Sequence, residues 1–371
     1  MSVGQAHRIL FVASIGATLQ YFVQPLAAAL ERDGFETIAA AGDVSTLKYF
    51  SRSYELPSFR RRGPREVASA FRRLSDIVTL EQPDLLHLHT PPALMLGRLA
   101  AKRHGVRSVA VIHGTFLEPR GWRSVVYASM EGLLGHSSIS TVTVNEEDAK
   151  FYRRLAGKRP VSVAPVGGLG LDLDRLSAAF RSPDRIAAAP SVVVVGRLTT
   201  DKNLDLVVSA FGKFRVRYPH ATLTFVGAAM PGEPPWNVPQ MPGIASRPWM
   251  PDPYPIIAGA DLVVSASRRE GFALGVAEAL ALGVPAAAVS NRGVRQLLRS
   301  GVTALTTCPP TARALAHAMD RAIGRGAPEG ERARLTSMWS RENAVNFHRE
   351  VVHRALDLKT PSASGGLMEA R

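Results

Sequence analysis

The chain has 371 residues and a mass of 39.9 kDa, and at roughly 100–200 residues per domain this length predicts two domains, each with its own core. Hydrophobic residues make up 46% and charged residues 20%, a composition that excludes a disordered or fibrous protein. The single cysteine, Cys308, excludes a module held by internal disulfides and fits a reducing compartment. A net charge of +14 predicts attraction to nucleic acid, membrane headgroups or phosphorylated small molecules.

Short apolar runs alternate with helical patterns along the chain, which is typical of a parallel sheet covered on both faces. The first run, Ile9–Ala17, resembles a short secretory signal, but its glycine turn followed by a helical pattern favours a buried strand. A helix is predicted from Pro64 to about Leu80, with proline in its first turn. The strands predicted in the first half are Arg8–Ala13, Glu36–Ala41, Leu85–His89, Ser108–His113, Thr141–Val144 and Ser162–Pro165.

A second series of strands predicts a second domain of the same kind. Its strands are Ser191–Gly196, Thr222–Gly227, Ile244–Ser246, Asp261–Ser265 and Val284–Val289. We therefore predict an α/β protein with two doubly wound domains, residues 1–183 and 184–340, separated near a linker at Pro183–Pro190. Residues 341–358 form a C-terminal helix that can return to the N-terminal domain, and residues 359–371 form a tail expected to be mobile.

The segment Ser267–Leu280 is the most informative part of the sequence. A strand leads into a polar turn, and a helix is expected to start near Ala273, where unpaired amides and the helix dipole attract an anion. Glu270 and Glu278 are eight residues apart and would repel a phosphate unless they bind hydroxyl groups. A sugar nucleotide offers both partners, namely a diphosphate and sugar hydroxyls. The alternative is that both glutamates are solvated, which the apolar neighbours of Glu278 disfavour.

Two basic residues lie where a diphosphate would need them. Arg197 and Lys202 follow the first strand of the second series, at the carboxyl end where open α/β sheets bind ligands. Two bases in a loop carry little weight alone, but the glutamate segment is predicted at the same sheet edge.

These residues resemble the retaining GT-B glycosyltransferases of family 4, in particular the capsule and exopolysaccharide branch, over about 340 residues. The matching pieces in the second half are Val195-Gly196-Arg197-Leu198 with Asp201-Lys202, Arg247–Tyr254, Arg269-Glu270-Gly271-Phe272 with Glu278-Ala279, and Gly283-Val284-Pro285. Those in the first half are His87–Pro91, Leu96–Ala100, His113-Gly114, Asn145–Asp148 and Gly168–Asp172. The glutamate segment is the most specific of them.

The resemblance implies two Rossmann-like domains facing across a cleft, with a nucleotide sugar held by the C-terminal one. Arg197 and Lys202 would hold the diphosphate and stabilise the leaving group. Glu278 would bind the ribose, and Glu270 the donor-sugar hydroxyls. The remaining donor-binding positions would be Gly16 and the amides of Gly271, Phe272, Ala273 and Leu274. Family members often carry two adjacent glycines in the first turn, where this chain has Ile15-Gly16-Ala17.

Three histidines are candidates on the acceptor side. The resemblance implies that His113, at the end of a strand, lies near the reacting end of the sugar. A strand-end histidine is otherwise often a hydrogen-bonded structural residue. His87 and His89 share one face of their strand, since side chains alternate, and either can approach the acceptor. Metal binding by this pair is disfavoured without a third ligand.

No metal or other cofactor is expected. Asp172-Leu173-Asp174 resembles the metal-binding Asp-x-Asp of the other glycosyltransferase architecture, which is a single mixed-sheet domain. Asp172 is better interpreted as part of a Gly-x-Gly-x-Asp turn.

Basic residues gather around the helix that begins at Pro64, namely Arg60, Arg61, Arg62, Arg65, Arg72 and Arg73. They form either a solvated face or a contact with an anionic membrane, where each arginine contributes about 1 kcal/mol. Nucleic-acid binding is disfavoured because no known binding motif accompanies the charge. We expect a cytoplasmic protein, peripheral on the inner face of the cell membrane.

The leading hypothesis is a retaining transferase that moves a hexose or N-acetylhexosamine from a nucleotide diphosphate sugar to a polyprenyl-diphosphate-linked saccharide. UDP is favoured over GDP by the resemblance to the capsule branch. The alternatives are a GDP-mannose-dependent mannosyltransferase, a sugar-nucleotide 2-epimerase of the same architecture, and a non-catalytic protein that binds the donor.

Overall fold

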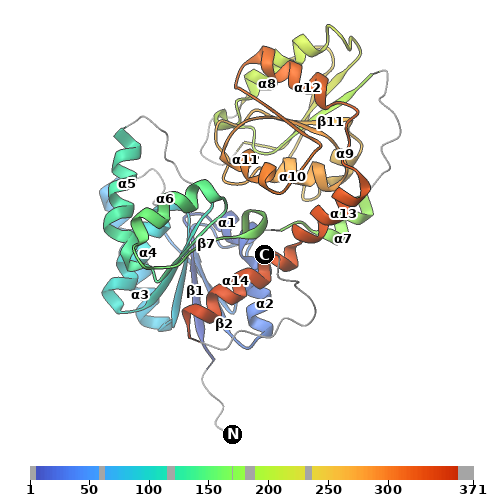
Figure 1. Cartoon of the computed structure of the whole chain (residues 1–371). Coiled ribbons are helices and arrows are strands. Elements are labelled where there is room, and N and C mark those ends of the chain that lie inside the picture. Colours follow the sequence, from blue (N-terminus) through green and yellow to red (C-terminus); the bar gives the residue numbers. More distant parts are fainter. Residues whose placement is uncertain are drawn as a thin grey trace. The chain divides into compact units, whose positions relative to one another are not determined.

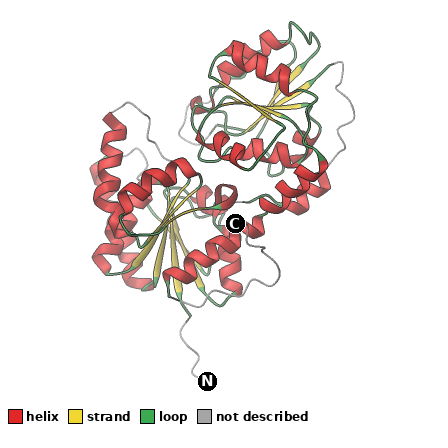
Figure 2. Cartoon of the chain, viewed as in Figure 1, coloured by secondary structure: helices red, strands yellow, loops and turns green. Residues whose placement is uncertain are grey.

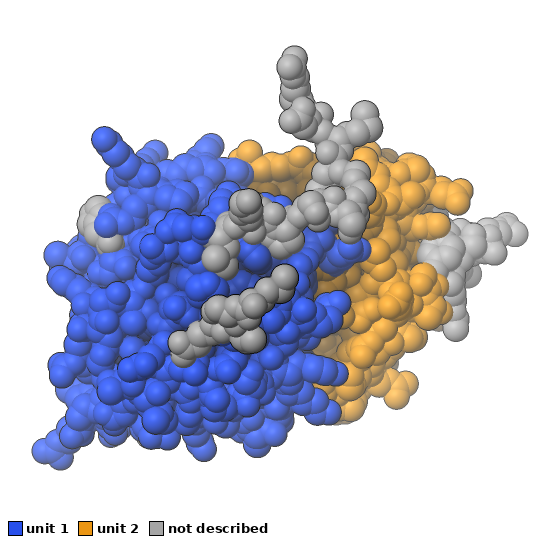
Figure 3. Space-filling model, turned by 90° about the horizontal axis from the view of Figure 1, so that it is seen from below, with its two compact units in different colours: residues 1–169, 342–371 blue, residues 170–341 orange. Residues whose placement is uncertain are grey.

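The computed structural model describes residues 6–57, 63–114, 122–168, 170–179, 189–229 and 236–357. The chain forms two compact units, of which unit 1 comprises Met1–Leu169 with Glu342–Arg371 and unit 2 comprises Gly170–Arg341 (Figure 3). The domain boundary expected at residues 183–184 lies outside the described residues, and the segment from Gly170 is already part of unit 2. The expected tail, 359–371, also lies outside the described residues.

Within the described residues, unit 1 contains a parallel sheet of seven strands in the order β3-β2-β1-β4-β5-β6-β7 (Figure 2). The strands are β1 Arg8–Val12, β2 Glu36–Ala41, β3 Arg52–Glu55, β4 Leu85–His89, β5 Arg107–Ile112, β6 Ser140–Thr143 and β7 Val161–Val163. All six strands predicted for this half are confirmed, with ends that shift by one or two residues. The sequence analysis missed β3, because this edge strand is largely exposed and carries no apolar alternation.

Helices cover both faces of this sheet (Figure 1). They are α1 Gly16–Phe22, α2 Gln24–Arg32, α3 Pro64–Glu81, α4 Pro91–His104, α5 Trp122–Leu134, α6 Glu146–Ala156 and α14 Arg341–Ala355. One core lies between the sheet and α3 and α4, with Leu74 and Ile77 among its buried side chains. The other core lies between the sheet and α1, α2 and α14.

The C-terminal helix α14 is part of unit 1, which is the return to the N-terminal domain that the sequence analysis considered. Its Val351 and Val352 belong to the same buried cluster as Leu26 and Leu30 of α2. Arg349 donates from Nε and Nη2 to the two carboxylate oxygens of Asp33, each at 2.7 Å. This two-bond geometry joins the C-terminal end of α2 to the middle of α14, through two residues 316 positions apart in the chain.

Unit 2 repeats the architecture with a parallel sheet of six strands among the described residues, in the order β10-β9-β8-β11-β12-β13. The strands are β8 Ser191–Val195, β9 Thr222–Val226, β10 Ile244–Arg247, β11 Leu262–Ser265, β12 Ala286–Val289 and β13 Leu305–Cys308. The helices are α7 Leu173–Ala179, α8 Leu204–Phe214, α9 Tyr254–Ala258, α10 Leu274–Ala281, α11 Arg292–Arg299, α12 Ala312–Ala322 and α13 Glu329–Met338. The sequence analysis missed β13, which only four residues define.

Because every strand of each sheet is parallel, all carboxyl ends within a unit emerge at one edge. The loop after β8, the loop after β11 and the loop after β12 therefore meet at one edge of unit 2. The loops after β4 and β5 do the same in unit 1. These two edges contain the site residues that the sequence singled out.

Candidate functional site

In unit 2, the centre of the candidate site is an ion pair between Lys202 and Glu270. Lys202 ends a short 3₁₀ turn, Thr200–Lys202, in the loop after β8, and Glu270 lies between β11 and α10. The Lys202 ammonium donates to Glu270 Oε1 at 2.5 Å, and the two side chains are 17% and 18% exposed. The structure thus brings together two residues that the sequence predicted separately, and each neutralises the other while remaining accessible.

Backbone contacts hold the Glu270 loop on two sides. The Arg268 amide donates to the carbonyl of Asp201 at 2.9 Å, which fixes the loop to the Lys202 segment. On the other side, the buried Asn291 side chain donates to the Ser267 carbonyl at 2.9 Å. Asn291 also caps α11 by accepting from the Val294 amide. The sequence analysis missed Asn291, whose role depends on a loop 24 residues earlier.

Gly293 also supports this loop, by its small size. Its amide donates to the Glu270 carbonyl at 3.1 Å. A Cβ at this position would lie 2.8 Å from both the Ala273 nitrogen and Glu270 Cβ, closer than side chains tolerate. Only glycine therefore lets α11 approach the loop so closely.

Glu278 lies on α10, four residues after the helix begins and therefore about 6 Å along its axis. The side chain is 9% exposed. Burial, with a smaller contribution from the negative charge of Asp252, raises the pKa of Glu278 to about 8. This burial excludes the solvated alternative for Glu278. A buried acid with a raised pKa is typical of a functional position, and its contact with a ligand stays a prediction.

The other donor-side positions differ in how they are engaged. Arg197 is 42% exposed and pairs with Asp201 at 3.1 Å, so its guanidinium is in reach of solvent. The Leu274 amide was predicted to bind an anion. In the structure it donates to the Phe272 carbonyl at 3.0 Å, within the turn. The Phe272 ring packs edge-on against Trp339, with centroids 6.3 Å apart. The roles of Gly271, Phe272 and Ala273 stay predictions.

In unit 1, the predicted histidines form a hydrogen-bonded row. His87 Nδ1 lies 2.8 Å from His89 Nε2, and His89 Nδ1 lies 2.9 Å from His113 Nε2. The first contact confirms that His87 and His89 share a face of β4. Burial, with repulsion from His348, lowers the pKa of His113 to about 3, and the pKa values of His87 and His89 are lowered well below the ordinary range for the same reason. All three imidazoles are therefore neutral.

The expectation that His87 or His89 contacts the acceptor is not compatible with their burial. His87 is 0% exposed and His89 2% exposed, because β4 is a central strand with helices over both faces. His113 follows β5 and is partly exposed, so it is the histidine of the row that can meet a ligand. The sequence analysis missed the fourth member of this cluster, His348, which comes from α14 and whose ring lies 5.9 Å from that of His87.

Two unusual backbone positions, Thr90 and Gly16, lie at the carboxyl edge of the unit 1 sheet, as His113 does. Thr90, directly after His89, has φ of 68°, a conformation that is a genuine outlier for a β-branched residue and that clusters at functional sites. Its hydroxyl accepts from the Ser14 amide at 3.0 Å. Gly16 leaves no room for a Cβ, which would lie 1.7 Å from the Asp43 carbonyl oxygen. This packing explains why glycine is needed at position 16, and a contact with the donor there stays a prediction.

Asp172 is engaged by arginine side chains and by the start of a helix. Asp172 accepts from Arg341 at 2.8 Å and from the Arg175 amide at the start of α7 at 3.3 Å. No group of three or more potential ligand side chains that could hold a metal ion occurs among the described residues. The interpretation of Asp172 as a turn residue fits these contacts.

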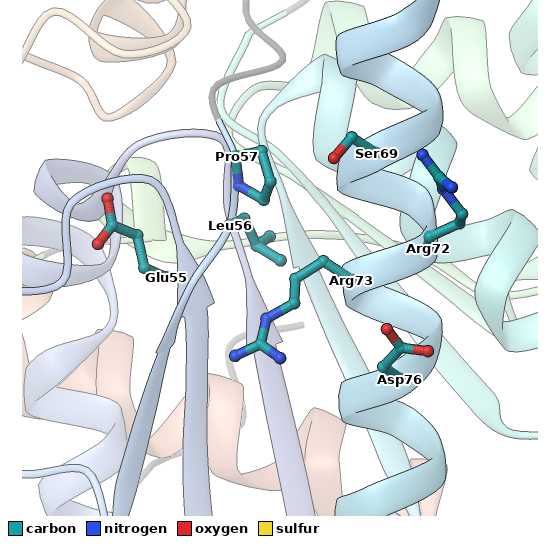
Figure 4. A pocket seen from close by; sticks show the side chains of 7 residues that line it. All are labelled: Glu55, Leu56, Pro57, Ser69, Arg72, Arg73 and Asp76. Atoms are coloured by element: carbon teal, nitrogen blue, oxygen red, sulfur yellow. The ribbon is translucent and has the colours of Figure 1, made fainter.

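Part of the basic segment can be placed. Arg60, Arg61 and Arg62 lie outside the described residues, whereas Arg65, Arg72 and Arg73 are exposed on α3. Figure 4 shows Arg73 extending toward the neighbouring strands, where its guanidinium lies 5.8 Å from the Tyr54 ring, while Arg72 points away from them.

Arg72 and Arg73 border a pocket of about 580 Å³, whose lining residues are Glu55, Leu56, Pro57, Ser69, Arg72, Arg73 and Asp76. The two arginines are balanced by the two acids, so this pocket is not a basic site. In the part of the chain that the structure describes, no helix has the length and apolarity needed to cross a bilayer.

The raised pKa of Glu278 predicts how the stability of unit 2 depends on pH. Between about pH 4.5 and 8 the folded chain keeps the Glu278 proton, whereas the unfolded chain has lost it. Folding then takes up a proton, so the free energy of unfolding falls as pH rises, by about 1.4 kcal/mol per pH unit. Glu278→Gln is neutral at every pH and lacks this contribution. Urea unfolding of both proteins from pH 5 to 8 should show the variant gaining on the parent, and parallel curves would contradict the burial of an acid here.

Comparison with known proteins agrees with both units. Residues 19–167 match the family model described as Glycosyltransferase Family 4, and residues 189–325 match the model described as Glycosyl transferases group 1. The chain is 26% identical to EpsD of Bacillus subtilis (strain 168), a protein described provisionally as a glycosyltransferase. The alignment covers 79% of this chain and 81% of EpsD.

Two solved structures have the same fold. HepE of Anabaena, in complex with UDP and glucose, superposes with a TM-score of 0.69 at 18% identity, over 93% of this chain and 98% of that chain. A protein of Listeria monocytogenes, described provisionally as a UDP-N-acetylglucosamine 2-epimerase, superposes with a TM-score of 0.62 at 12% identity, over 96% and 99%. The fold by itself therefore does not separate transferases from epimerases. The family models, one matched by each doubly wound unit, do so, and they identify the chain as a glycosyltransferase of the GT-B fold.

Proposed function

We propose that the protein is a retaining transferase that moves a hexose or N-acetylhexosamine from a UDP-sugar to a polyprenyl-diphosphate-linked saccharide, in the assembly of capsule, exopolysaccharide or O-antigen. The observation that carries the proposal is the accessible Lys202–Glu270 pair, with the buried acid Glu278 on the helix that follows the Glu270 loop. A cation, a carboxylate and a buried acid match the diphosphate, sugar and ribose of one ligand. The UDP and glucose bound to HepE, and the likeness to EpsD, support the choice of nucleotide and pathway.

The proposed mechanism uses charge that is already in place. Arg197 and Lys202 would compensate the negative charge that grows on the diphosphate as the bond to the sugar breaks. The Lys202 ammonium already pairs with the Glu270 carboxylate, so a bound diphosphate would be its second anionic partner. Glu270 is held by the loop contacts of Arg268 and Gly293 and would accept hydrogen bonds from sugar hydroxyls. His113 would meet the sugar as a neutral imidazole.

The experiment that separates the candidate functions is incubation of the full chain with a panel of UDP- and GDP-sugars and a membrane lipid extract, followed by mass analysis of lipids and nucleotides. A lipid product that gains one sugar from a UDP donor is expected. Transfer from GDP-mannose alone would identify a mannosyltransferase instead. A changed sugar without any acceptor would identify an epimerase, and donor binding without transfer or hydrolysis a binding protein.

Replacing Glu278 and replacing Glu270 should have different effects on UDP affinity and on sugar transfer. Glu278→Ala removes the partner of the ribose, so the affinity for UDP should fall by about 1–3 kcal/mol in a calorimetric titration. Glu270→Ala should leave UDP affinity close to that of the parent while transfer falls far more, since its partner is the sugar. Glu350→Ala provides a control for acid removal outside both sites, because Glu350 is exposed near the end of α14 that contacts Arg107 at the amino end of β5. Equal losses of binding and transfer in the Glu270 variant would contradict this division.

We further propose that transfer needs no metal ion. Arg197, Lys202 and the amino end of α10 would neutralise the diphosphate, and Asp172 is engaged by two arginines. Activity should therefore survive excess chelator in an assay that follows sugar release. Loss of activity that a divalent cation restores would direct attention to Asp172 and Asp174.

The basic residues around α3 are proposed to bind the chain to the inner face of an anionic membrane. Replacing Arg61, Arg62, Arg65 and Arg72 by Glu should release the protein from vesicles that contain anionic phospholipid, since each arginine near the surface contributes about 1 kcal/mol. Activity on a soluble short-chain acceptor should persist. Added salt should weaken binding of the parent, because exposed charges are screened beyond about 8 Å.

A matched control separates local from overall charge. Four exposed arginines of unit 2 can be reversed instead, namely Arg299, Arg313, Arg321 and Arg325. Each four-site change lowers the net charge of +14 by 8, to +6. Vesicle binding should be lost only with the set around α3. If both variants sediment with vesicles as the parent does, the basic segment is a solvated face.

A further inference from the structure

Unit 2 also has a pocket between the helices α8 and α12. Its volume of about 490 Å³ lies within the range of roughly 300–1,000 Å³ that is typical of small-molecule sites. Figure 1 shows both helices on the face of the sheet opposite to α10, the helix that carries Glu278. Lys202 precedes α8 and Lys213 lies near its end, so about 16 Å of chain along the helix separates this pocket from the candidate donor site.

The rim of the pocket is cationic. Lys213 and Arg217 come from the end of α8 and the turn after it, whereas Arg313 and His317 lie one turn apart on α12. Asp320 is the one acid among the lining residues that the structure describes. The permanent charges are therefore three cations against one acid, a net charge of +2, which attracts an anion.

One of the three cations is already paired, and the other two are not. Arg217 donates from Nη1 to Asp320 Oδ2 at 3.1 Å, and its guanidinium lies 5.6 Å from the centre of the Tyr218 ring. Lys213 and Arg313 have neither an acidic partner nor a side-chain hydrogen bond in the described part of the chain. Because both line the same pocket from different helices, an anion inside it would have two cations to pair with.

The floor of the pocket is apolar. Phe214 is buried, and Ala314 and Ala316 pack against the core cluster that α8 and α12 form with the sheet. At the rim, the Thr311 hydroxyl accepts from the Ala314 amide at 3.2 Å, which leaves its O–H to donate to a ligand. The pocket thus offers cations to a charged group and apolar surface to an organic group attached to it.

We propose that this pocket binds a soluble phosphate monoester that carries a small organic group. Such a phosphate has a charge of about −1.5 to −2 at neutral pH, which matches the net charge of the lining residues. The guanidinium of Arg313 can bind two phosphate oxygens at once, and the Lys213 ammonium adds a second charge. The site does not rest on the proposed function, because it uses no residue assigned to the donor or the acceptor.

Calorimetric titration of the full-length protein with phenyl phosphate tests the proposal, at constant ionic strength set with chloride. Phenyl phosphate combines a dianion with an apolar ring, whereas phenyl sulfate has a similar shape and a single charge. We expect the sulfate to bind at least tenfold more weakly. Equal binding of the two would overturn the match with a dianion. The absence of any phenyl phosphate binding at millimolar concentration would overturn the site.

Two double variants locate the binding. Lys213→Ala with Arg313→Ala removes the two unpaired cations and should weaken phenyl phosphate binding at least tenfold. Arg299→Ala with Arg325→Ala removes two exposed arginines of unit 2 outside the pocket and should leave binding unchanged. Both changes lower the net charge of +14 by 2, to +12. Equal losses in the two double variants would mean attraction by overall charge and would overturn the proposal.

Lys202→Ala separates the pocket from the candidate donor site, which is the other place where a phosphate could bind. Phenyl phosphate should bind this variant as it binds the parent. Loss of binding with Lys202→Ala, and not with the Lys213 and Arg313 double variant, would move the ligand to the donor site and overturn the proposal.

Asp320→Asn provides a test whose sign a folding defect does not imitate. The change removes the acid of the rim and the charged partner of Arg217, so the affinity for phenyl phosphate should rise several-fold. A lower affinity in the folded variant would contradict the role of charge in the pocket.

Vesicles that contain phosphatidic acid distinguish a free ligand from a lipid headgroup with the same phosphate. The Lys213 and Arg313 double variant should sediment with these vesicles as the parent does. A selective loss of sedimentation in this variant would assign the pocket to a lipid and overturn the soluble ligand.

Discussion

Both units depend on one constraint. Two parallel strands can be joined only by a crossover that carries the chain from the carboxyl end of one strand back to the amino end of the next. Each crossover covers a face with a helix, so that strands such as β4 and β12 are buried throughout. Each strand also delivers its following loop to the same edge. The polar residues of the candidate site can therefore come from loops that are distant in sequence, as Lys202 and Glu270 do, and still lie within one hydrogen bond.

The candidate site residues of the two units differ in charge. In unit 2 the charges are kept and paired, since a partly exposed ammonium and carboxylate compensate each other at low desolvation cost. Glu278 is the exception, because its burial raises its pKa and so lowers the free energy of unfolding as pH rises from about 4.5 to 8. In unit 1 the candidate histidines are neutral imidazoles, which hydrogen-bond to one another, while the buried Arg98 and Glu131 elsewhere in the unit form an ion pair. The candidate residues of unit 2 are thus charged or acidic, whereas the histidine row of unit 1 is neutral.

Close backbone packing supports both arrangements. Gly293 lets α11 approach the Glu270 loop, and Gly16 lets α1 approach the loop after β2. Thr90 adopts a strained conformation directly after the buried histidines, at the start of α4. Strain of this kind persists only where surrounding contacts over-determine it, and here the contacts are those of the sheet edge that carries His113.

The sequence by itself determined the fold class, eleven strands and a set of candidate site residues, because short apolar runs and helix signals are local properties. Lys202, Glu270 and Glu278 were visible as charged groups at strand ends or in an apolar helix. Only the tertiary structure decided which of them touch. It also decided that His87 and His89 are buried and that Asn291 and Gly293 support the Glu270 loop. His348 lies on α14, which the Arg349–Asp33 contact joins to α2 across 316 residues of sequence. These are facts about packing between segments far apart in the chain, and a single sequence carries no signal that pairs such segments. The edge strand β3 was missed for the complementary reason, since an exposed strand has no apolar period to detect.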